Sequence, residues 1–327
     1  MIKRCCDQAA LALLRAAPAR LMHHLMFILR QHPEIPDRWG HHIRPIHYYE
    51  PLPDFRRITA EQVERRRSYP AIDFNWSAQL ELIEKLGSSY RDELAALRQN
   101  RQFDFANSYF AGFDAAVYYA LIRHLRPARV IEIGAGYSSR LAHEALARNR
   151  QDNAPGKLIC IEPYAESRLT EAQLDMELIA QPVEKIPLEF FSDLAANDIL
   201  FIDSSHTVKF NGDVCYEFLE ILPCLNPGVW VHVHDIFFPH DYPAQWLVEQ
   251  RLAFNEQYLV EAVLSFNPAF AVALANHWLG LDHANCVNQL WPYAGNRRDS
   301  VAAGFSSLWL YRRATNDVRH SGTPVTA

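Results

Sequence analysis

The sequence predicts an α/β fold in which a parallel sheet is covered by helices on both faces. From about residue 110 onward, short apolar runs of strand length alternate with stretches of helical periodicity. Such alternation is typical of a parallel sheet that is buried on both sides. The second observation is a pair of glycines at an expected strand-to-helix junction, in Val130-Ile-Glu-Ile-Gly-Ala-Gly-Tyr-Ser-Ser139. A glycine turn in that position lets backbone approach a ligand closely.

The apolar runs predict short buried strands. They are Arg129–Ile133, Lys157–Ile161, Leu178–Gln181, Asp198–Asp203, Val229–His234, Phe270–Leu274 and Ser307–Arg312. Helical periodicity predicts the intervening helices. They are Ala115–Leu125, Tyr137–Asn149, Glu166–Leu174, Val214–Leu222 and Pro243–Phe266. We expect Asn276–Val301 to form a long loop or insertion, which would suit a lid.

The first hundred residues have a different pattern. Residues 8–31 show apolar positions at helical spacing and predict one amphipathic helix, and residues 77–99 predict another. Between them, residues 33–54 contain five prolines and are expected to be extended, since proline removes a donor and restricts its predecessor.

We therefore expect a division into three parts. An N-terminal helical and extended segment spans residues 1–104 and could serve as a substrate lid or an oligomerisation layer. A ligand-binding domain spans residues 105–315, and residues 316–327 form a flexible tail. The amphipathic helix at the N-terminus could pair with a second copy of the chain, giving a homo-oligomer.

The composition is that of a globular protein, with 49% hydrophobic and 21% charged residues. A net charge of −6 argues against non-specific nucleic-acid binding over the whole surface. Residues 1–70, however, hold twelve Lys and Arg against seven Asp and Glu. This basic segment is compatible with a solvated helix face, with an anionic substrate or with a membrane surface.

Cysteine usage and apolar run lengths bear on the compartment. The six cysteines form no Cys-x-x-Cys pair, and several lie in apolar runs, as buried free thiols do. That pattern suits a reducing cytoplasm better than a disulfide scaffold. No run reaches the roughly 18 apolar residues that a membrane span requires. We expect a cytoplasmic enzyme without a transmembrane segment.

The glycine motif and its acidic neighbours predict a nucleotide-type ligand. A dinucleotide fingerprint requires a third glycine for close helix–strand packing, and Ser139 occupies that place. Glu132 precedes Gly134 by two residues and could accept from the ammonium group of an amino-acid-like ligand. Glu162 ends the next strand, where a carboxylate can accept both ribose hydroxyls of either nucleotide class. An NAD-dependent oxidoreductase and a non-catalytic adaptor remain alternatives.

Taken in order, these motifs resemble those of class I S-adenosylmethionine-dependent methyltransferases. They are Glu132-Ile-Gly-Ala-Gly-Tyr-Ser-Ser139, Ile161-Glu-Pro163, Ile199-Leu-Phe-Ile-Asp-Ser-Ser-His206, Asn226-Pro-Gly-Val-Trp-Val-His-Val-His-Asp235 and Ser306-Ser-Leu-Trp-Leu-Tyr311. The resemblance covers about residues 105–312 and is greatest for the branch with Asp-x-x-His after the fourth strand. It implies a Rossmann-like seven-stranded sheet whose last strand is antiparallel.

The resemblance also implies how S-adenosylmethionine is held. The methionine moiety would be lined by the first strand and the glycine turn, at Glu132, Gly134, Ala135, Gly136 and Ser138. Glu162 would hold the ribose, Gln181–Glu184 would flank the adenine, and Asp203 would complete the cofactor site. This adenine segment departs from the family, because Gln181-Pro-Val lacks the expected acidic residue.

Two neighbouring strand ends carry further polar side chains. Asp203 and His206 follow one strand, and His234 and Asp235 end the next, so we expect them at one rim of the sheet. Asp203, His206 and Asp235 could bind a divalent cation such as Mg²⁺, which would activate and orient an acceptor hydroxyl. This resembles metal-dependent O-methyltransferases, although a histidine lies beside Asp235 where those often have an acidic or amide ligand.

Two alternatives to the cation remain open. His206 or His234 could act as a general base, with Asp235 as the third catalytic residue, or the histidines could only bind loop backbone. We expect His232 to point away from His234 and to be packed. Asp114 could face the cofactor or cap the helix that follows it.

The expected reaction is O-methylation of a small polar acceptor. Nucleic acid is not expected, since the Asp203-Ser-Ser-His206 segment differs from the Asn/Asp-Pro-Pro-Tyr-type motif of most base-modifying relatives.

Overall fold

The computed structural model describes residues 2–164, 174–293 and 304–314. Contacts divide the chain into two units, Met1–Arg57 and Ile58–Ala327, each of which is described by itself. The expected tail at 316–327 lies outside the described residues. So does the expected helix at Glu166–Leu174, except for its last residue. None of the described helices is both long and apolar enough to cross a bilayer.

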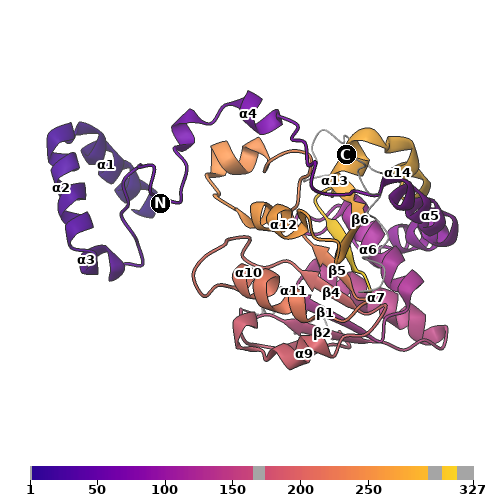
Figure 1. Cartoon of the computed structure of the whole chain (residues 1–327). Coiled ribbons are helices and arrows are strands. Elements are labelled where there is room, and N and C mark those ends of the chain that lie inside the picture. Colours follow the sequence, from indigo (N-terminus) through magenta and orange to yellow (C-terminus); the bar gives the residue numbers. More distant parts are fainter. Residues whose placement is uncertain (1, 165–173, 294–303, 315–327) are drawn as a thin grey trace, which may run out of the picture. The chain divides into compact units, whose positions relative to one another are not determined.

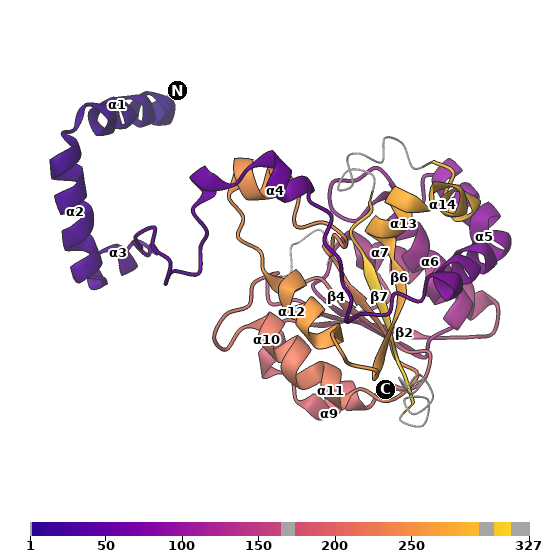
Figure 2. The same cartoon turned by 45° about the horizontal axis from the view of Figure 1, so that its top comes forward.

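The first unit is helical and carries few buried residues. It consists of α1 (Ile2–Ala16), α2 (Ala19–Gln31), the short α3 (Glu34–Asp37) and a 3₁₀ turn, η1 (Phe55–Arg57). The single helix expected over 8–31 is wrong, because Pro18 lies before α2 with ψ of 131° and lacks the N–H that would continue α1. Figure 2 shows α1 and α2 as separate helices.

The second unit begins before the expected domain boundary. It starts with α4 (Ala60–Glu64) and α5 (Trp76–Gln99), and α5 packs against α14 (Ala284–Leu290) and α6 (Gly112–Leu125). Residues 58–104, which the sequence analysis grouped with the N-terminal segment, therefore belong in the structure to the unit that contains the sheet. The apolar face of α5 supplies buried side chains such as Ile83, Leu86 and Leu94.

A sheet of seven strands forms the centre of this unit. Its strands are β1 (Arg129–Ile133), β2 (Lys157–Ile161), β3 (Glu177–Ile179), β4 (Ile199–Ile202), β5 (Trp230–Val233), β6 (Phe270–Ala275) and β7 (Leu308–Arg312). They lie in the order β3-β2-β1-β4-β5-β7-β6. The first five are parallel, and β7 runs antiparallel between β5 and β6. The Rossmann-like fold with an antiparallel last strand is thus confirmed, and every expected strand is present.

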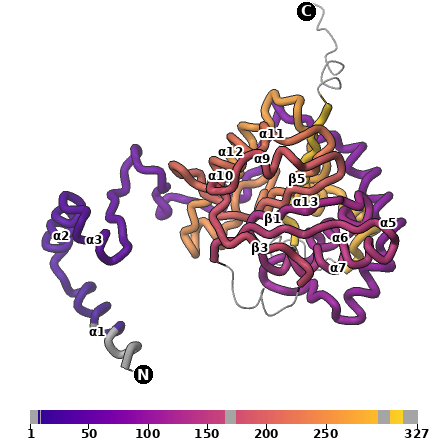
Figure 3. The backbone as a smooth tube through the Cα atoms, turned by 90° about the horizontal axis from the view of Figure 1, so that it is seen from below, coloured from indigo at the N-terminus to yellow at the C-terminus, as the bar shows by residue number. Residues whose placement is uncertain are grey.

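Helices cover both faces of the sheet (Figure 1). The remaining described α-helices are α7 (Tyr137–Gln151), α9 (Leu188–Ser192), α10 (Asp213–Tyr216), α11 (Leu222–Cys224), α12 (Glu256–Leu264) and α13 (Asn276–Asp282). Beside them lie a 3₁₀ helix, η2 (Val183–Lys185), and two π-helices, η3 (Glu217–Ile221) and η4 (Gln245–Gln250). Seen from below, α9 to α12 lie on one side of the strands and α6 and α7 on the other (Figure 3). Successive residues of a strand point to opposite faces of the sheet, so they pack into two separate hydrophobic cores. Val130 and Phe201 belong to one core, and Ile131 and Ile202 belong to the other.

Two expectations for the C-terminal third are wrong. Pro243–Phe266 is not one helix, because Arg251 adopts a left-handed conformation at φ 56° and separates η4 from α12. The described part of Asn276–Val301 is not a loop, since it forms α13 and α14, whose buried Leu279 and Val287 join the core.

Asp114 fixes the segment that leads into β7. Its buried carboxylate accepts from the backbone N–H groups of Ser306 and Ser307 at 2.7 and 3.1 Å, and from Nδ2 of Asn276 at 2.8 Å. It neither faces the cofactor cavity nor caps α6 through its side chain. Asp114 therefore joins α6, α13 and the approach to β7, and Ser307 in turn contacts the histidines of β5.

We predict that Asp114→Ala lowers the free energy of unfolding by about 3–5 kcal/mol, because three buried donors lose their acceptor. Urea denaturation followed by circular dichroism measures this change. Asp92→Ala, at an exposed position on α5, is the control and should change stability by less than about 0.5 kcal/mol. Equal stability of the two variants would contradict the role assigned to Asp114.

Candidate active site

The site lies where the strand order reverses, at the carboxyl ends of β1 and β4. Ligands of open α/β sheets bind at such a point. A cavity of about 310 Å³ opens there, lined by the loop after β1 and by Glu162 and Asp203. Every glycine-turn residue predicted for the cofactor lines it, together with several aromatic side chains. These residues are Gly134, Ala135, Gly136, Ser138, Tyr109, Phe110, Tyr137 and Tyr164.

The two glycines of the loop have different roles. Gly134 has φ of +86°, and a Cβ added to it would lie 2.0 Å from the carbonyl oxygen of Asp203. The loop therefore requires glycine at this position, both for its backbone angle and for the close crossing of β4. At Gly136 a Cβ would meet no atom within 4 Å, so this glycine keeps space open in the cavity.

Glu162 lies at the end of β2, as expected for a ribose ligand. Its Oε1 accepts from the backbone N–H of Tyr164 at 2.7 Å, and its Oε2 accepts from that of Ala135 at 3.4 Å. A neighbouring cavity of about 350 Å³ shares Glu162 and Asp203 and is also lined by Pro182, Val183 and Glu184. Most of the segment expected to flank the adenine is thus next to the glycine loop.

Glu132 lies beneath the loop instead of lining the cavity. Its side chain is fully buried and accepts from the hydroxyls of Tyr118 at 2.7 Å and of Ser139. Ser138 donates a longer bond of 3.4 Å. Burial raises the pKa of Glu132 to about 7, although the hydrogen bonds from Ser139 and Tyr118 lower it. Glu132 therefore supports the start of α7 from below, and the contact expected between Glu132 and an ammonium group stays a prediction.

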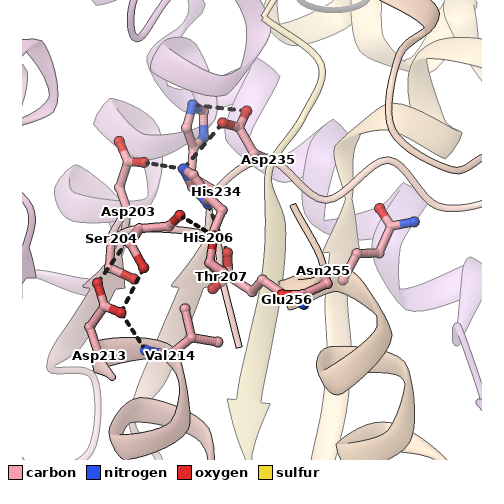
Figure 4. Close-up of polar contacts among 12 residues, drawn as sticks. Asp203, Ser204, His206, Thr207, Asp213, Val214, His234, Asp235, Asn255 and Glu256 are labelled. Carbon is pink, nitrogen blue, oxygen red and sulfur yellow. Dashed lines mark hydrogen bonds and ion pairs between the residues drawn. The ribbon is translucent and has the colours of Figure 1, made fainter. Parts of the chain in front are cut away.

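Asp203, His206 and Asp235 come together at the same rim (Figure 4). Nε2 of His206 lies 3.4 Å from a carboxylate oxygen of Asp203 and 3.4 Å from one of Asp235. One potential ligand atom from each residue lies within 4.8 Å of the others. His206 and Asp235 both have left-handed backbone, at φ 55° and 57°. Strained conformations of non-glycine residues concentrate at functional sites.

Glu256 completes the surroundings of His206 and was missed by the sequence analysis. It is the first residue of α12, about fifty positions away, and its Oε2 lies 2.8 Å from Nδ1 of His206. The glutamate is buried. The only sequence signal was an acidic residue after Asn255, inside a stretch that was assigned to one long helix. Both nitrogens of His206 thus face carboxylates.

The electrostatics of this rim follow from its three carboxylates. Desolvation raises the pKa of Asp203, but the imidazoles of His234 and His206 outweigh it and hold the pKa at about 2. Burial lowers the pKa of His206, yet Asp203 and Glu256 outweigh it and raise that pKa well above its ordinary value. The carboxylates also raise the pKa of His234 in spite of its burial, so acids and imidazoles of the rim stabilise each other's charged forms beside the cavity.

His234 and His232 lie on the same face of β5, so the expectation that they point apart is wrong. Residues two apart on a strand share a face, and their rings stack at 5.5 Å. His232 is packed, as expected, with its ring 4.0 Å from that of Phe201, and burial lowers its pKa well below the usual value. Nε2 of His234 lies 3.7 Å from Asp235.

We predict that two substitutions in the glycine loop affect different properties, one the stability of the fold and the other the binding of the ligand. Gly134→Ala should lower the free energy of unfolding, by about 2 kcal/mol or more, because its Cβ collides with backbone. Gly136→Ala should keep wild-type stability but bind S-adenosylhomocysteine at least tenfold more weakly, because its Cβ enters the cavity. Urea denaturation and titration calorimetry measure the two effects. Wild-type affinity in Gly136→Ala would exclude a ligand from this part of the cavity.

We also predict a pH dependence from Glu132. Its folded-state pKa of about 7 exceeds the ordinary 4.5. Between these pH values the unfolded chain releases a proton that the native carboxyl keeps, so stability falls as pH rises and then levels above about 7. The loss from this group is on the order of 3 kcal/mol.

Urea denaturation of Glu132→Gln at pH 5 and pH 7 checks this, since the variant should lose less stability over that interval than the wild type. Glu81→Gln, at an exposed position on α5, should follow the wild type. Parallel pH profiles for all three proteins would refute the assignment to Glu132.

Two comparisons of the sequence match known proteins over part of the chain. A family model described as a methyltransferase domain matches residues 131–236. An uncharacterized protein of Archaeoglobus fulgidus is 33% identical over 167 residues, which is 47% of this chain and 75% of that protein.

Several solved methyltransferase structures are more distantly similar. The O-methyltransferase TomG from Streptomyces achromogenes, in complex with S-adenosylmethionine, is 18% identical with a TM-score of 0.37, over 67% of this chain and 88% of that one. An O-methyltransferase from Bacillus cereus in complex with S-adenosylhomocysteine is 13% identical with a TM-score of 0.38, over 69% and 91%. MycE of the mycinamycin biosynthetic pathway, in complex with Mg and S-adenosylhomocysteine, is 17% identical with a TM-score of 0.38, over 71% and 57%.

The matched domain begins in β1 and ends just after β5, so it contains the glycine loop, Glu162 and the Asp203–Asp235 rim. This match decides between the two nucleotide classes that the glycine motif left open. The chain belongs to the class I S-adenosylmethionine-dependent methyltransferases.

Proposed function

We propose that this enzyme methylates a hydroxyl oxygen of a small polar acceptor, which is bound and activated at the Asp203–His206–Asp235 rim. The observation that carries the proposal is the position of Asp203. It lines the cavity of the glycine loop and also lies 3.4 Å from His206. A hydroxyl held at the rim would therefore be adjacent to a donor held in the cavity.

The rim residues fit a divalent cation. Two carboxylates and one imidazole, with ligand atoms within 4.8 Å of one another, offer oxygen and nitrogen donors suited to a hard or borderline ion such as Mg²⁺. Bound there, such an ion would lower the pKa of an acceptor hydroxyl and orient it. The carboxylates of Asp203 and Asp235 on one side of His206 and of Glu256 on the other favour a cation at this place.

Glu256 is the second feature that supports a ligand role for His206. A histidine that binds a metal commonly donates its other ring N–H to a carboxylate, which fixes the tautomer and the ring orientation. Here Glu256 accepts at Nδ1 of His206, so Nε2 is the nitrogen directed at Asp203 and Asp235. The same geometry suits the alternative in which His206 is a general base, because a base is also oriented through its second nitrogen.

The protein's own groups have separate tasks in either case. The glycine loop and Glu162 bind the donor, and the rim holds the acceptor oxygen, so that the sulfur–carbon bond breaks as the carbon–oxygen bond forms. The hydroxyl proton must leave toward the rim or water. Placing the two reactants in line supplies much of the catalysis in such a transfer.

Aromatic side chains line the cavity that would hold the donor. Tyr109 and Tyr137 stack at 5.5 Å, and Phe110 completes the wall. Binding sites for small molecules are commonly built from aromatic side chains and a few polar groups. The net charge of −6 argues against a nucleic-acid acceptor.

We predict that dialysis against EDTA abolishes methyl transfer to hydroxylated acceptors and that Mg²⁺ or Mn²⁺ restores it. Asp235→Asn should reduce kcat at least about 100-fold, because a ligand charge is lost. Glu256→Gln should weaken metal binding about 10- to 100-fold, as loss of a partner behind a metal ligand does. Mn²⁺ binding to the protein without donor or acceptor, followed by electron paramagnetic resonance, gives a readout that does not depend on activity.

Asp193→Asn, at an exposed position after α9, is the matched control and should retain both metal binding and activity. Full activity after EDTA treatment together with full activity of Asp235→Asn would refute the cation. Activity that survives EDTA but is lost in His206→Gln would assign His206 as the base. Transfer to a nitrogen or carbon atom, with none to oxygen, would refute O-methylation itself.

A further inference from the structure

In the first unit, taken by itself, the two long helices carry apolar side chains that the rest of that unit leaves uncovered. On α1, Leu13 and Leu14 are 74% and 57% exposed, and α2 has no buried residue at all. Leu21, Leu25, Met26 and Ile28 of α2 are each more than a third exposed. Isolated exposed leucines are ordinary, but a continuous apolar helix face left in water marks an interaction surface.

The polar side of these helices is basic. Residues 2–31 contain five Lys and Arg, which are Lys3, Arg4, Arg15, Arg20 and Arg30, against the single acid Asp7. At 100° per residue, Arg20, His23 and Arg30 of α2 fall on the side opposite Leu25, where the exposed Phe27 also lies. His24 lies at the border between the two sides. The rest of the chain is net negative, since the whole carries −6. The apolar face and the positive charge are therefore confined to the same short segment.

We propose that α1 and α2 bind the surface of an anionic lipid bilayer, lying in its interface with the apolar faces inward. Helices with a wide apolar face and Lys or Arg on the other face bind in this manner. Neither helix is long and apolar enough to span a bilayer, so the binding is peripheral. The enzyme would then reach acceptors that are dissolved in, or presented at, that surface.

Charge decides between a bilayer and a second copy of the chain. Two copies packed through these helices would bring together two segments of the same positive sign, with one acid in each to offset it. An anionic lipid surface has the opposite sign, and each Lys or Arg close to it increases partitioning about fivefold. The lipid headgroups would also be reached by Arg20 and Arg30 while the leucines are buried.

Vesicle sedimentation of the full-length protein tests this proposal. We expect binding to vesicles of phosphatidylcholine with 30% phosphatidylglycerol, and at least tenfold weaker binding to pure phosphatidylcholine. The double variant Leu25→Glu with Ile28→Glu should reduce binding to the anionic vesicles at least tenfold. Arg20→Gln with Arg30→Gln should reduce it about 25-fold, because two basic contacts are lost.

The matched control is Gln8→Glu with Gln31→Glu, which adds the same two negative charges outside the apolar faces. It should lose clearly less vesicle binding than Leu25→Glu with Ile28→Glu, and all variants should bind S-adenosylhomocysteine as the wild type does. Failure to bind anionic vesicles overturns the proposal. A dimer in analytical ultracentrifugation that Leu25→Glu with Ile28→Glu dissociates, without any vesicle binding, would assign the helices to self-association instead.

Discussion

Between β1 and β4, the α-carbon of Gly134 approaches the carbonyl oxygen of Asp203 so closely that a single Cβ would lie 2.0 Å from it. Two backbone hydrogen bonds hold this crossing, from Asp203 N–H to Ile133 at 2.9 Å and from Gly134 N–H to Ile161 at 3.0 Å. The cofactor loop and the rim therefore share one rigid junction. In the proposed function, this backbone junction would set the distance between the donor in the cavity and the acceptor at the rim.

The parts of the fold that the sequence could predict are those that depend on local periodicity. The strands from Arg129–Ile133 to Leu308–Arg312 are short apolar runs bounded by polar residues, and each was found within a residue or two of its expected place. The prediction of a single helix over Pro243–Phe266 was wrong because the left-handed turn at Arg251 leaves no signal in the pattern of apolar residues. Helices α13 and α14 are seven residues each and were missed because such short helices depend on packing, α14 on α5 and α13 on α14 and β6.

In the candidate site, too, the residues at strand ends could be placed from the sequence, whereas contacts made by packing of distant segments could not. Asp203, His206 and Asp235 could be placed together because the carboxyl ends of parallel strands meet at one edge. Glu256 could not be placed beside them from the sequence, because it contacts His206 from a helix whose position depends on the turn at Arg251. Glu132 was given a ligand role from its place in the motif, whereas its burial under Tyr118 and Ser139 is a property of the packed core.

Glu132 and Glu256 illustrate how burial gives two carboxylates different uses. Glu132 is satisfied by hydroxyl donors, and burial therefore favours its neutral form, which suits a brace beneath the loop. Burial raises the pKa of Glu256 as well, but its partner is an imidazole that lowers this pKa and faces two further carboxylates. A neutral Glu256 would leave Nδ1 of His206 without its anionic partner. His206 lies between Glu256 on one side and Asp203 and Asp235 on the other. Its state therefore decides between the two proposed roles, a ligand of a cation or a base that accepts the hydroxyl proton.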